Sequence, residues 1–151
     1  MPAQFTVRIM IWKEALPLAR PVRERVFIKE QRVPRELEWD EWDEASDHAV
    51  AFDADGNSIG TARLLPDGRI GRMAVLKDWR RKGVGAALLA AILDRARGRS
   101  MARVVLHAQT HAAGFYRRFG FSEWGGEFVE AGIPHVEMAL DLSPATGSGD
   151  S

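Results

Sequence analysis

The chain has 151 residues, the size of one ordinary domain, and its 46% hydrophobic content is enough to bury one sizeable core. Lysine plus arginine number 21 and aspartate plus glutamate number 21, so the formal net charge is zero, which argues against binding to nucleic acid or an acidic membrane through overall charge. There is no cysteine, which excludes disulfides, thiolate metal ligands and a cysteine nucleophile.

Residues 1–12 lack the long apolar run and the small-residue cleavage site of a secretion signal. The chain also lacks an apolar run of about 18 residues, the minimum for a membrane-spanning helix. We therefore expect a cytoplasmic protein that does not cross a membrane.

The N-terminal part predicts a strand over residues 5–12 and then a helix over 18–32. The helix is indicated by Val22, Val26 and Phe27 at helical spacing, with Pro21 in its first turn and Pro34 ending it. Residues 36–47 read ELEWDEWDEASD, with seven acidic residues and no basic one. This pattern fits neither a helix face nor a two-sided strand, so it predicts a loop.

Three strands are predicted next, over residues 48–53, 58–65 and 69–76. The turn sequences DGN and PDG separate them, which predicts an antiparallel meander. Residues 83–99 have an apolar helical stripe, and residues 102–107 form a short apolar strand. A strand, helix and strand of this length predict a parallel pair with a right-handed crossover.

The C-terminal part predicts a short helix over 112–119 and a last pair of strands over 122–129 and 134–142. Residues 143–151 are small and polar, and we expect them to be a disordered tail. The sequence contains no internal repeat and no linker. It therefore predicts one domain of mixed α/β class over residues 3–142.

The stretch most informative about function is 70–89, where a strand leads through a basic, glycine-bearing turn into a helix. Gly83 and Gly85 let the backbone approach an anion, and the free N–H groups and dipole of the helix N-terminus favour negative charge. The Walker A pattern is absent, and so is the third glycine of a dinucleotide fingerprint. A glycine cap on a surface helix with incidental arginines remains the alternative.

Residues 80–85, RRKGVG, resemble the signature of the GNAT superfamily of N-acetyltransferases: glutamine or arginine, two residues, glycine, one residue, and glycine or alanine. Residues 108–121, AQTHAAGFYRRFGF, resemble a second segment of that family, and the resemblance covers about residues 7–142. Residues 27–34, FIKEQRVP, and 132–135, GIPH, resemble the ElaA-like branch. The implied fold is a twisted, mostly antiparallel mixed sheet with a splayed parallel pair in the middle and about four flanking helices.

The resemblance implies acetyl-CoA as acyl donor and no metal. The pyrophosphate would lie on the amides of residues 81–86, and the pantetheine arm on the strand before them. The residues implied in donor binding are Met73, Ala74, Val75, Arg80, Arg81, Lys82, Gly83, Val84, Gly85, Ala86, Gln109, Phe115 and Tyr116.

Tyr116 is the only tyrosine of the chain and falls in the second family segment. The resemblance implies that its phenol is the general acid that protonates the departing thiolate of CoA. A phenol with a pKa of about 10 is protonated at neutral pH and so has a proton to give. The alternative is an aromatic ring packed in the core with its hydroxyl satisfied.

The general base is left open. Some GNAT enzymes use a glutamate on the strand before the basic turn, but residues 70–76 contain no carboxylate. Candidates for the base are Glu30, Glu38, His48, His111 and His135, of which we select Glu38 and His135. Residues expected at the acceptor site are Glu30, Gln31, Glu38, Asp40, His48 and His135. A lone histidine on a strand, such as His48 or His107, is more often structural.

These residues predict direct acetyl transfer from acetyl-CoA to an amine in a ternary complex, without a covalent enzyme intermediate. The acidic segment 36–47 would attract a cationic acceptor, or is simply a solvated loop. Two alternatives remain: a non-catalytic acyl-CoA sensor, and an interaction domain that docks through Trp39 and Trp42. We expect no nucleic-acid or membrane partner, and a homodimer is one expected state because dimers are common in the superfamily.

Overall fold

The structure is a computed structural model that describes residues 4–33 and 40–142. One seven-stranded sheet runs through it in the order β1-β2-β3-β4-β5-β7-β6. The strands are β1 (Phe5–Ile11), β2 (Asp47–Asp53), β3 (Ser58–Leu64), β4 (Arg69–Val75), β5 (Arg103–Gln109), β6 (Ser122–Glu130) and β7 (Ile133–Asp141). The helices of the described part are α1 (Trp12–Arg23), the π-helix η1 (Glu24–Glu30), α3 (Trp42–Ala45), the 3-10 turn η2 (Lys77–Trp79), α4 (Val84–Gly98), the 3-10 turn η3 (Thr110–Ala112) and α5 (Ala113–Arg118). The predicted mixed α/β class is confirmed.

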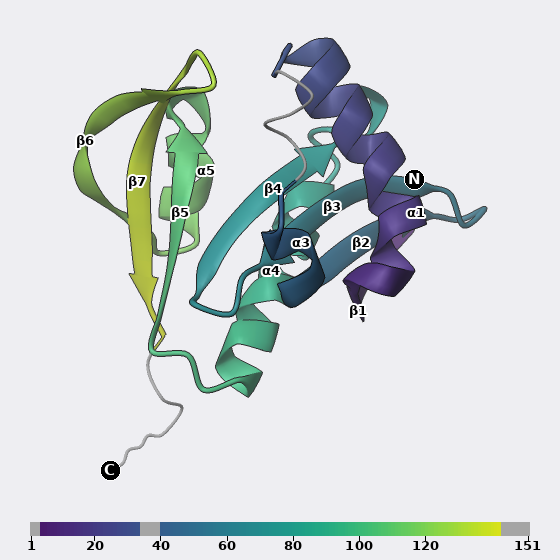
Figure 1. The fold of residues 1–151 in the computed structure, drawn as a ribbon, viewed down its shortest axis with the longest axis horizontal. Helices are drawn as coiled ribbons and strands as arrows, with labels where there is room; N and C mark the ends of the chain where they lie inside the picture. Colours follow the sequence, from purple (N-terminus) through teal and green to yellow (C-terminus); the bar gives the residue numbers. More distant parts are fainter. Residues whose placement is uncertain (1–3, 34–39, 143–151) are drawn as a thin grey trace.

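The central pair of strands, β4 and β5, is parallel, and every other neighbouring pair is antiparallel. The parallel ladder consists of two residue pairs, Arg69 with Val105 and Ile70 with Leu106. Beyond these pairs the two strands diverge, as Figure 1 shows. The expected splayed parallel pair in the middle of the sheet is confirmed.

Two layers of helix cover β1–β4. Helix α4 packs on one face in the main apolar core, which continues under α5 across β5 and β7. Helix α1 and η1 pack on the opposite face, where Val50 and Ala74 contact them. Successive side chains of β2 point to opposite faces of the sheet: Ala49 and Ala51 pack on the α4 side and Val50 on the α1 side. In the described chain no helix lies over the face of β5, β7 and β6 opposite α5 (Figure 1).

The first helix begins earlier than its prolines suggest. We expected a helix over 18–32 with Pro21 in the first turn, but α1 starts at Trp12 and has Pro17 and Pro21 inside it. Both prolines are exposed, while Ala15, Ala19 and Val22 form the buried stripe that holds the helix on the sheet. After Arg23 the helix widens into η1.

The acidic segment is also more ordered than we expected. The predicted loop over 36–47 contains α3 and the first residue of β2, and residues 34–39 lie outside the described part. Asp43 and Asp47 are buried rather than solvated, because each binds arginine side chains. The remaining predicted elements agree with the structure to within about two residues at each end, the usual uncertainty of element boundaries.

The narrow end of the parallel pair depends on a close approach of backbones at Gly68. The carbonyl oxygen of Gly68 accepts a hydrogen bond from the N–H of Val105 at 3.1 Å. The residue has φ +95°, and a Cβ there would lie 2.7 Å from the carbonyl oxygen of Arg103. Glycine is required at this turn for both its conformation and its lack of a side chain.

We predict that Gly68→Ala lowers the free energy of unfolding by about 2–3 kcal/mol, because the new methyl group collides with backbone that has no room to move. Chemical denaturation of the purified variant measures this loss. Gly56→Ala is the matched control, since Gly56 has φ +86° but nothing lies within 4 Å of the point where its methyl group would stand. Equal losses in both variants would contradict the role given to the contact with Arg103.

Candidate active site

The N-terminus of α4 has the backbone geometry expected of an anion site. Gly83 caps the helix in the left-handed conformation with φ +87°. The first intrahelical bond runs from the N–H of Ala87 to the carbonyl of Gly83 at 3.0 Å. The N–H groups of Val84, Gly85 and Ala86 therefore precede the helical ladder, at the positive end of the helix dipole. Arg81 and Lys82 are exposed beside them.

Arg80 is held by protein groups instead of standing free beside this helix end. Its Nε donates to the carbonyl of Val75 at 3.0 Å, and its two terminal nitrogens donate to the carboxylate of Glu30 at 2.6 and 2.7 Å. The hydrogen bonds from Arg80 outweigh the effect of burial and lower the pKa of Glu30. A carboxylate so engaged is a weak base, and Arg80 ties η1 to the end of β4.

Strand β4 has one extra residue in its middle. Thr61 pairs with Ala74 and Arg63 with Gly71, so Arg72 and Met73 lie opposite the single residue Ala62. Arg72 adopts φ +47°, a left-handed conformation that is strained for a residue with a side chain. Beyond Ile70 the β5-facing side of β4 has no partner in the parallel ladder. Peptide groups of residues 71–75 on that side thus have no partner on β5, although the Val75 carbonyl already accepts from Arg80.

Polar side chains gather at the carboxyl end of β5. Gln109 donates from Nε2 to Oε1 of Gln31 on the far side of the strand opening at 3.0 Å, and its own Oε1 accepts from Nε2 of His111 at 2.8 Å. His135 on β7 is the register partner of Gln109 and donates from Nδ1 to the carbonyl of Ile133 at 2.7 Å. The structure therefore brings Gln31, Gln109, His111 and His135 into one neighbourhood.

Tyr116 connects α5 to the bulge of β4. Its hydroxyl donates to Sδ of Met73 at 3.6 Å, and its ring packs edge-on against Phe115 and Phe121. Burial raises the pKa of Tyr116 to about 12, so the phenol is protonated at neutral pH. The Phe115 ring also lies against the first turn of α4, where a Cβ on Gly85 would be 3.7 Å from it. Tyr116 thus reaches from α5, which follows β5, to Met73 of β4.

His48 lies away from this opening. It is 1% exposed, stacks against Trp12 and donates from Nε2 to the carbonyl of Asp43 at 2.8 Å. Burial lowers the pKa of this imidazole despite the nearby Asp43 carbonyl and carboxylate. The expectation that His48 contacts an acceptor is therefore replaced by a structural role under α1.

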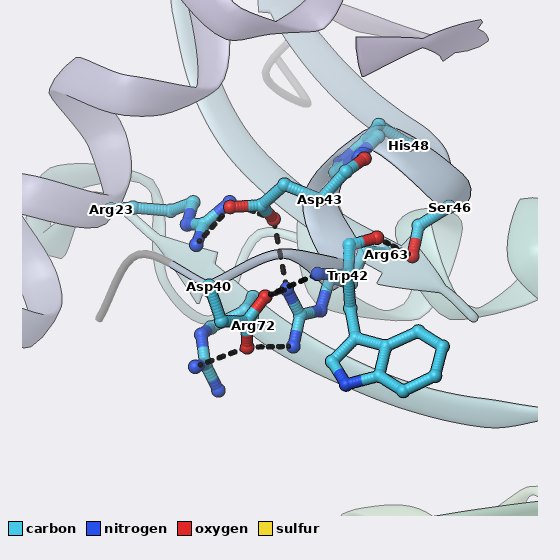
Figure 2. Close-up of polar contacts among 8 residues, drawn as sticks. All are labelled: Arg23, Asp40, Trp42, Asp43, Ser46, His48, Arg63 and Arg72. Carbon is cyan, nitrogen blue, oxygen red and sulfur yellow. Dashed lines mark hydrogen bonds and ion pairs between the residues drawn. The ribbon is translucent and has the colours of Figure 1, made fainter. Parts of the chain in front are cut away.

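The expected acceptor residue Asp40 belongs to a partly buried ionic network, shown in Figure 2. Its carboxylate binds Arg63 through two contacts of 2.6 and 2.8 Å and Arg72 through one of 3.1 Å. Arg63 also binds Asp43 at 2.8 Å, and Asp43 binds Arg23 at 2.8 and 3.3 Å.

The arginines of this network are site residues that sequence reasoning missed. One feature of the sequence could have indicated the network. Arg63 stands between apolar residues of a predicted strand, where a buried arginine needs a carboxylate partner, and the acidic segment 36–47 has seven carboxylates and no basic residue. The other selected base candidate, Glu38, lies outside the described residues.

Two features are absent from the described part. No group of three or more histidine, aspartate or glutamate side chains is arranged there to hold a metal ion. Within the same residues, no helix is long and apolar enough to cross a membrane.

Comparison with known proteins agrees with this geometry. The chain is 39% identical over 133 residues to the uncharacterized N-acetyltransferase YjcF of Bacillus subtilis, and the aligned region covers 85% of this chain and 94% of that protein. The crystal structure of Escherichia coli ElaA superposes with a TM-score of 0.81 at 26% identity, covering 91% of this chain and all of that one. An acyl-CoA N-acyltransferase from Pseudomonas aeruginosa gives a TM-score of 0.79 at 28% identity, covering 90% and 99% of the two chains.

The family model described as the acetyltransferase (GNAT) domain matches residues 14–142. This match spans the basic turn before α4, the diverging strands β4 and β5, and Tyr116. The chain is a member of the GNAT family of acetyltransferases.

Proposed function

We propose that the protein transfers the acetyl group of acetyl-CoA directly to a primary amine of a small molecule or peptide in a ternary complex. The observation that carries this proposal is the divergence of β4 and β5 beside the N-terminus of α4, with Tyr116 reaching from α5 to Met73 of β4. In this proposal the acetyltransferase domain spans residues 3–142.

The donor lies along β4 in this proposal. Its pyrophosphate binds the N–H groups of Val84, Gly85 and Ala86, with Arg81 and Lys82 beside it. The pantetheine arm follows the open side of β4, where peptide groups of Met73, Ala74 and Val75 lack partners on β5. One of their N–H groups then reaches the thioester carbonyl, which gains negative charge in the transition state.

The reaction needs no nucleophilic side chain. The nitrogen of a neutral amine attacks the carbonyl carbon of the thioester, and the C–N bond forms. The C–S bond of the tetrahedral intermediate then breaks, with its electron pair going to sulfur. The amine nitrogen loses one proton to a base, and the CoA thiolate gains one from an acid, so protons balance over the cycle.

Tyr116 is the hydrogen-bond donor to the sulfur in this scheme. Its raised pKa, about 12, keeps the proton on the phenol in the free protein but also makes that proton hard to remove. A thiol with a pKa of about 8.5 is the stronger acid, so complete transfer from the phenol is uphill. We therefore assign Tyr116 the task of hydrogen-bonding the sulfur as negative charge develops there, with solvent completing the protonation.

His135 is the base that the hydrogen bonds favour. Because its Nδ1 donates to the carbonyl of Ile133, the neutral ring has its accepting lone pair on Nε2. Glu30 is engaged by Arg80, and His48 is buried under α1. Glu38 remains an alternative base because it lies outside the described residues.

The acidic segment gives weaker support for a cationic acceptor than its sequence suggests. Asp40, Asp43 and Asp47 are all in ion pairs with arginines, which neutralises much of their charge. Glu41 and Glu44 are the exposed acids of the described part of this segment. The proposal therefore specifies a primary amine without requiring further positive charge on it.

A non-catalytic acyl-CoA-binding module is the second candidate, because the helix end and the open side of β4 would serve binding alone. The two functions differ in one measurable product. Acetyl-CoA should raise the melting temperature in both cases, since it binds the folded state. Release of CoA thiol that depends on an added amine is expected only from the enzyme, and a panel of primary amines measured by thiol titration tests it. Well-folded protein that neither gains stability nor releases thiol would rule out the acetyltransferase.

We predict that Gly85→Glu weakens acetyl-CoA binding at least about tenfold, because it places a negative charge at the helix end assigned to the pyrophosphate. Isothermal titration with acetyl-CoA measures the change. Gly98→Glu is the matched control: it adds the same side chain at the opposite end of α4, where nothing lies within 4 Å. Unchanged affinity in folded Gly85→Glu protein would show that the pyrophosphate binds elsewhere.

We predict that phenolate absorbance of the native protein titrates near pH 12 instead of 10, with no interference from other tyrosines because the chain has one. Since the folded-state pKa is raised, the associated stability is fully present below pH 10 and is lost as the pH rises from 10 toward 12. The loss is about 1.4 kcal/mol per pH unit in this interval, and Tyr116→Phe abolishes it.

The same variant tests the catalytic role. Tyr116→Phe should lower kcat about 100-fold and leave the Kd for acetyl-CoA within about twofold, because the ring stays and only the proton donor is lost. Phe121→Leu, which alters the packing of the Tyr116 ring without removing its hydroxyl, serves as control. A Tyr116→Phe enzyme with normal kcat would leave Tyr116 as core packing.

A further inference from the structure

We propose that Asp40 is a positioning residue for the acetyl-transfer site: its carboxylate, fixed by Arg63, holds Arg72 and so sets the direction of the peptide groups that follow in β4. This inference rests on the proposed function, because those peptide groups are the ones assigned to the thioester. It concerns a network that lies on the α1 side of the sheet and touches neither the helix end nor Tyr116 directly.

The first step is the strain at Arg72. This residue is the extra one in β4 and adopts φ +47°, where a side chain costs about 1–2 kcal/mol relative to a right-handed conformation. Such a conformation persists only when surrounding contacts hold it. The contact from Nη2 of Arg72 to Oδ2 of Asp40, at 3.1 Å, connects the strained residue to a rigid part of the molecule.

The second step is the rigidity of Asp40 itself. Both of its oxygens bind the two terminal nitrogens of Arg63, and its Oδ1 also accepts from the N–H of Trp42 at 3.1 Å. Burial opposes ionisation, but the hydrogen bonds and charge of Arg63 outweigh it and lower the pKa of Asp40. The carboxylate is thus charged at neutral pH and held by three hydrogen bonds, two from Arg63 and one from Trp42 (Figure 2).

The third step is the anchoring of Arg63 in the core. Arg63 is 5% exposed and also binds Asp43, which is 3% exposed and is bound by the fully buried Arg23 of α1. The side chain passes over Gly71, where a Cβ would lie 4.0 Å from Nε. In the described chain this Nε is the one buried side-chain nitrogen or oxygen without a hydrogen-bond partner.

The missing partner of this Nε indicates that the network is not arranged for stability alone. An unsatisfied buried donor costs about 1–3 kcal/mol, and buried ion pairs contribute little net stability compared with apolar residues of the same volume. The orientation of Arg63 is thus set by the need to bind Asp40 and Asp43 with its terminal nitrogens. The result is a fixed carboxylate beside the bulge, which an apolar side chain would not provide.

The last step leads from the bulge to the reaction. Met73 follows Arg72 directly, and its Sδ accepts the hydrogen bond of the Tyr116 hydroxyl at 3.6 Å. A rotation of the peptide at Arg72 would therefore move both the N–H groups assigned to the carbonyl and the contact of the proposed hydrogen-bond donor to the sulfur. Asp40 acts on the chemistry through Arg72, without touching the substrate.

Asp40→Asn tests this role, because it keeps the shape of the side chain and one accepting oxygen but removes the charge that holds Arg72. We expect kcat to fall about tenfold while the KM and Kd for acetyl-CoA change by less than about twofold, since the pyrophosphate site is untouched. The amide resonances of Met73, Ala74 and Val75 should shift in the free protein. In the complex, the carbonyl carbon-13 resonance of labelled acetyl-CoA should move toward its position in free acetyl-CoA. Asp40→Glu, which retains a carboxylate, should recover part of kcat.

Asp47→Asn is the matched control for lost stability. Asp47 is a buried carboxylate that binds Arg95 and Arg99 of α4 and contacts no residue of the bulge. It should lower the melting temperature but leave kcat and the amides of residues 73–75 unchanged. Equal loss of kcat in Asp47→Asn and Asp40→Asn would overturn the positioning role.

Arg72→Met gives a second route if Asp40→Asn folds poorly, because it leaves the contacts between Asp40 and Arg63 in place. It should lower kcat at least as much, and the double variant should be no slower than Arg72→Met alone, since in this proposal Asp40 acts on the reaction through Arg72. Additive losses would overturn the proposal.

The outcomes separate the two proposals. A wild-type protein that does not bind acetyl-CoA contradicts the proposed function and the positioning role with it. Normal binding, with the carbonyl resonance and the amides of residues 73–75 unchanged in Asp40→Asn, contradicts the positioning role alone.

Discussion

The parallel contact between β4 and β5 is the constraint on which the rest of the molecule depends. Two residue pairs and the hydrogen bond from Val105 to Gly68 join the strands at one end, and nothing in the ladder joins them at the other. Because backbone donors in a sheet normally pair with the next strand, this divergence leaves donors open within an otherwise complete sheet. The roles proposed for the helix end of α4 and for the hydroxyl of Tyr116 depend on this opening.

The elements with strong local signals were predictable from the sequence. The turns at 55–57 and 66–68 specify their own backbone, and the apolar stripe of α4 specifies its buried face. The start of α1 was not predictable in the same way. Pro17 and Pro21 argue locally against a helix interior, and the burial of Ala15, Ala19 and Val22 against the sheet overrides that preference.

The candidate site also has one part with a local sequence signal and one part that depends on contacts between distant residues. The turn proposed to bind an anion is contiguous in sequence, so Gly83 and Gly85 could be selected from their neighbours. The network around Asp40 joins residues from α1, the acidic segment, β3 and β4, and no local pattern links them. An acidic run with no basic residue predicts exposure when it is read alone. The structure instead pairs Asp40, Asp43 and Asp47 with arginines that are distant in sequence. Part of the equal number of acidic and basic residues in the chain is therefore present as specific ion pairs.

The short ladder between β4 and β5 has a mechanical consequence. Each half of the sheet keeps its own antiparallel pairings, so the halves can rotate about the end at Gly68 without breaking a hydrogen bond inside either half. A small rotation at this hinge becomes a larger change of width at the far ends of the strands. Phe115 of α5 packs against the first turn of α4, and this contact resists such a motion. The contacts of Gln109 with Gln31 and of Tyr116 with Met73 also cross the opening, so side-chain contacts and not the strand ladder oppose a change in its width.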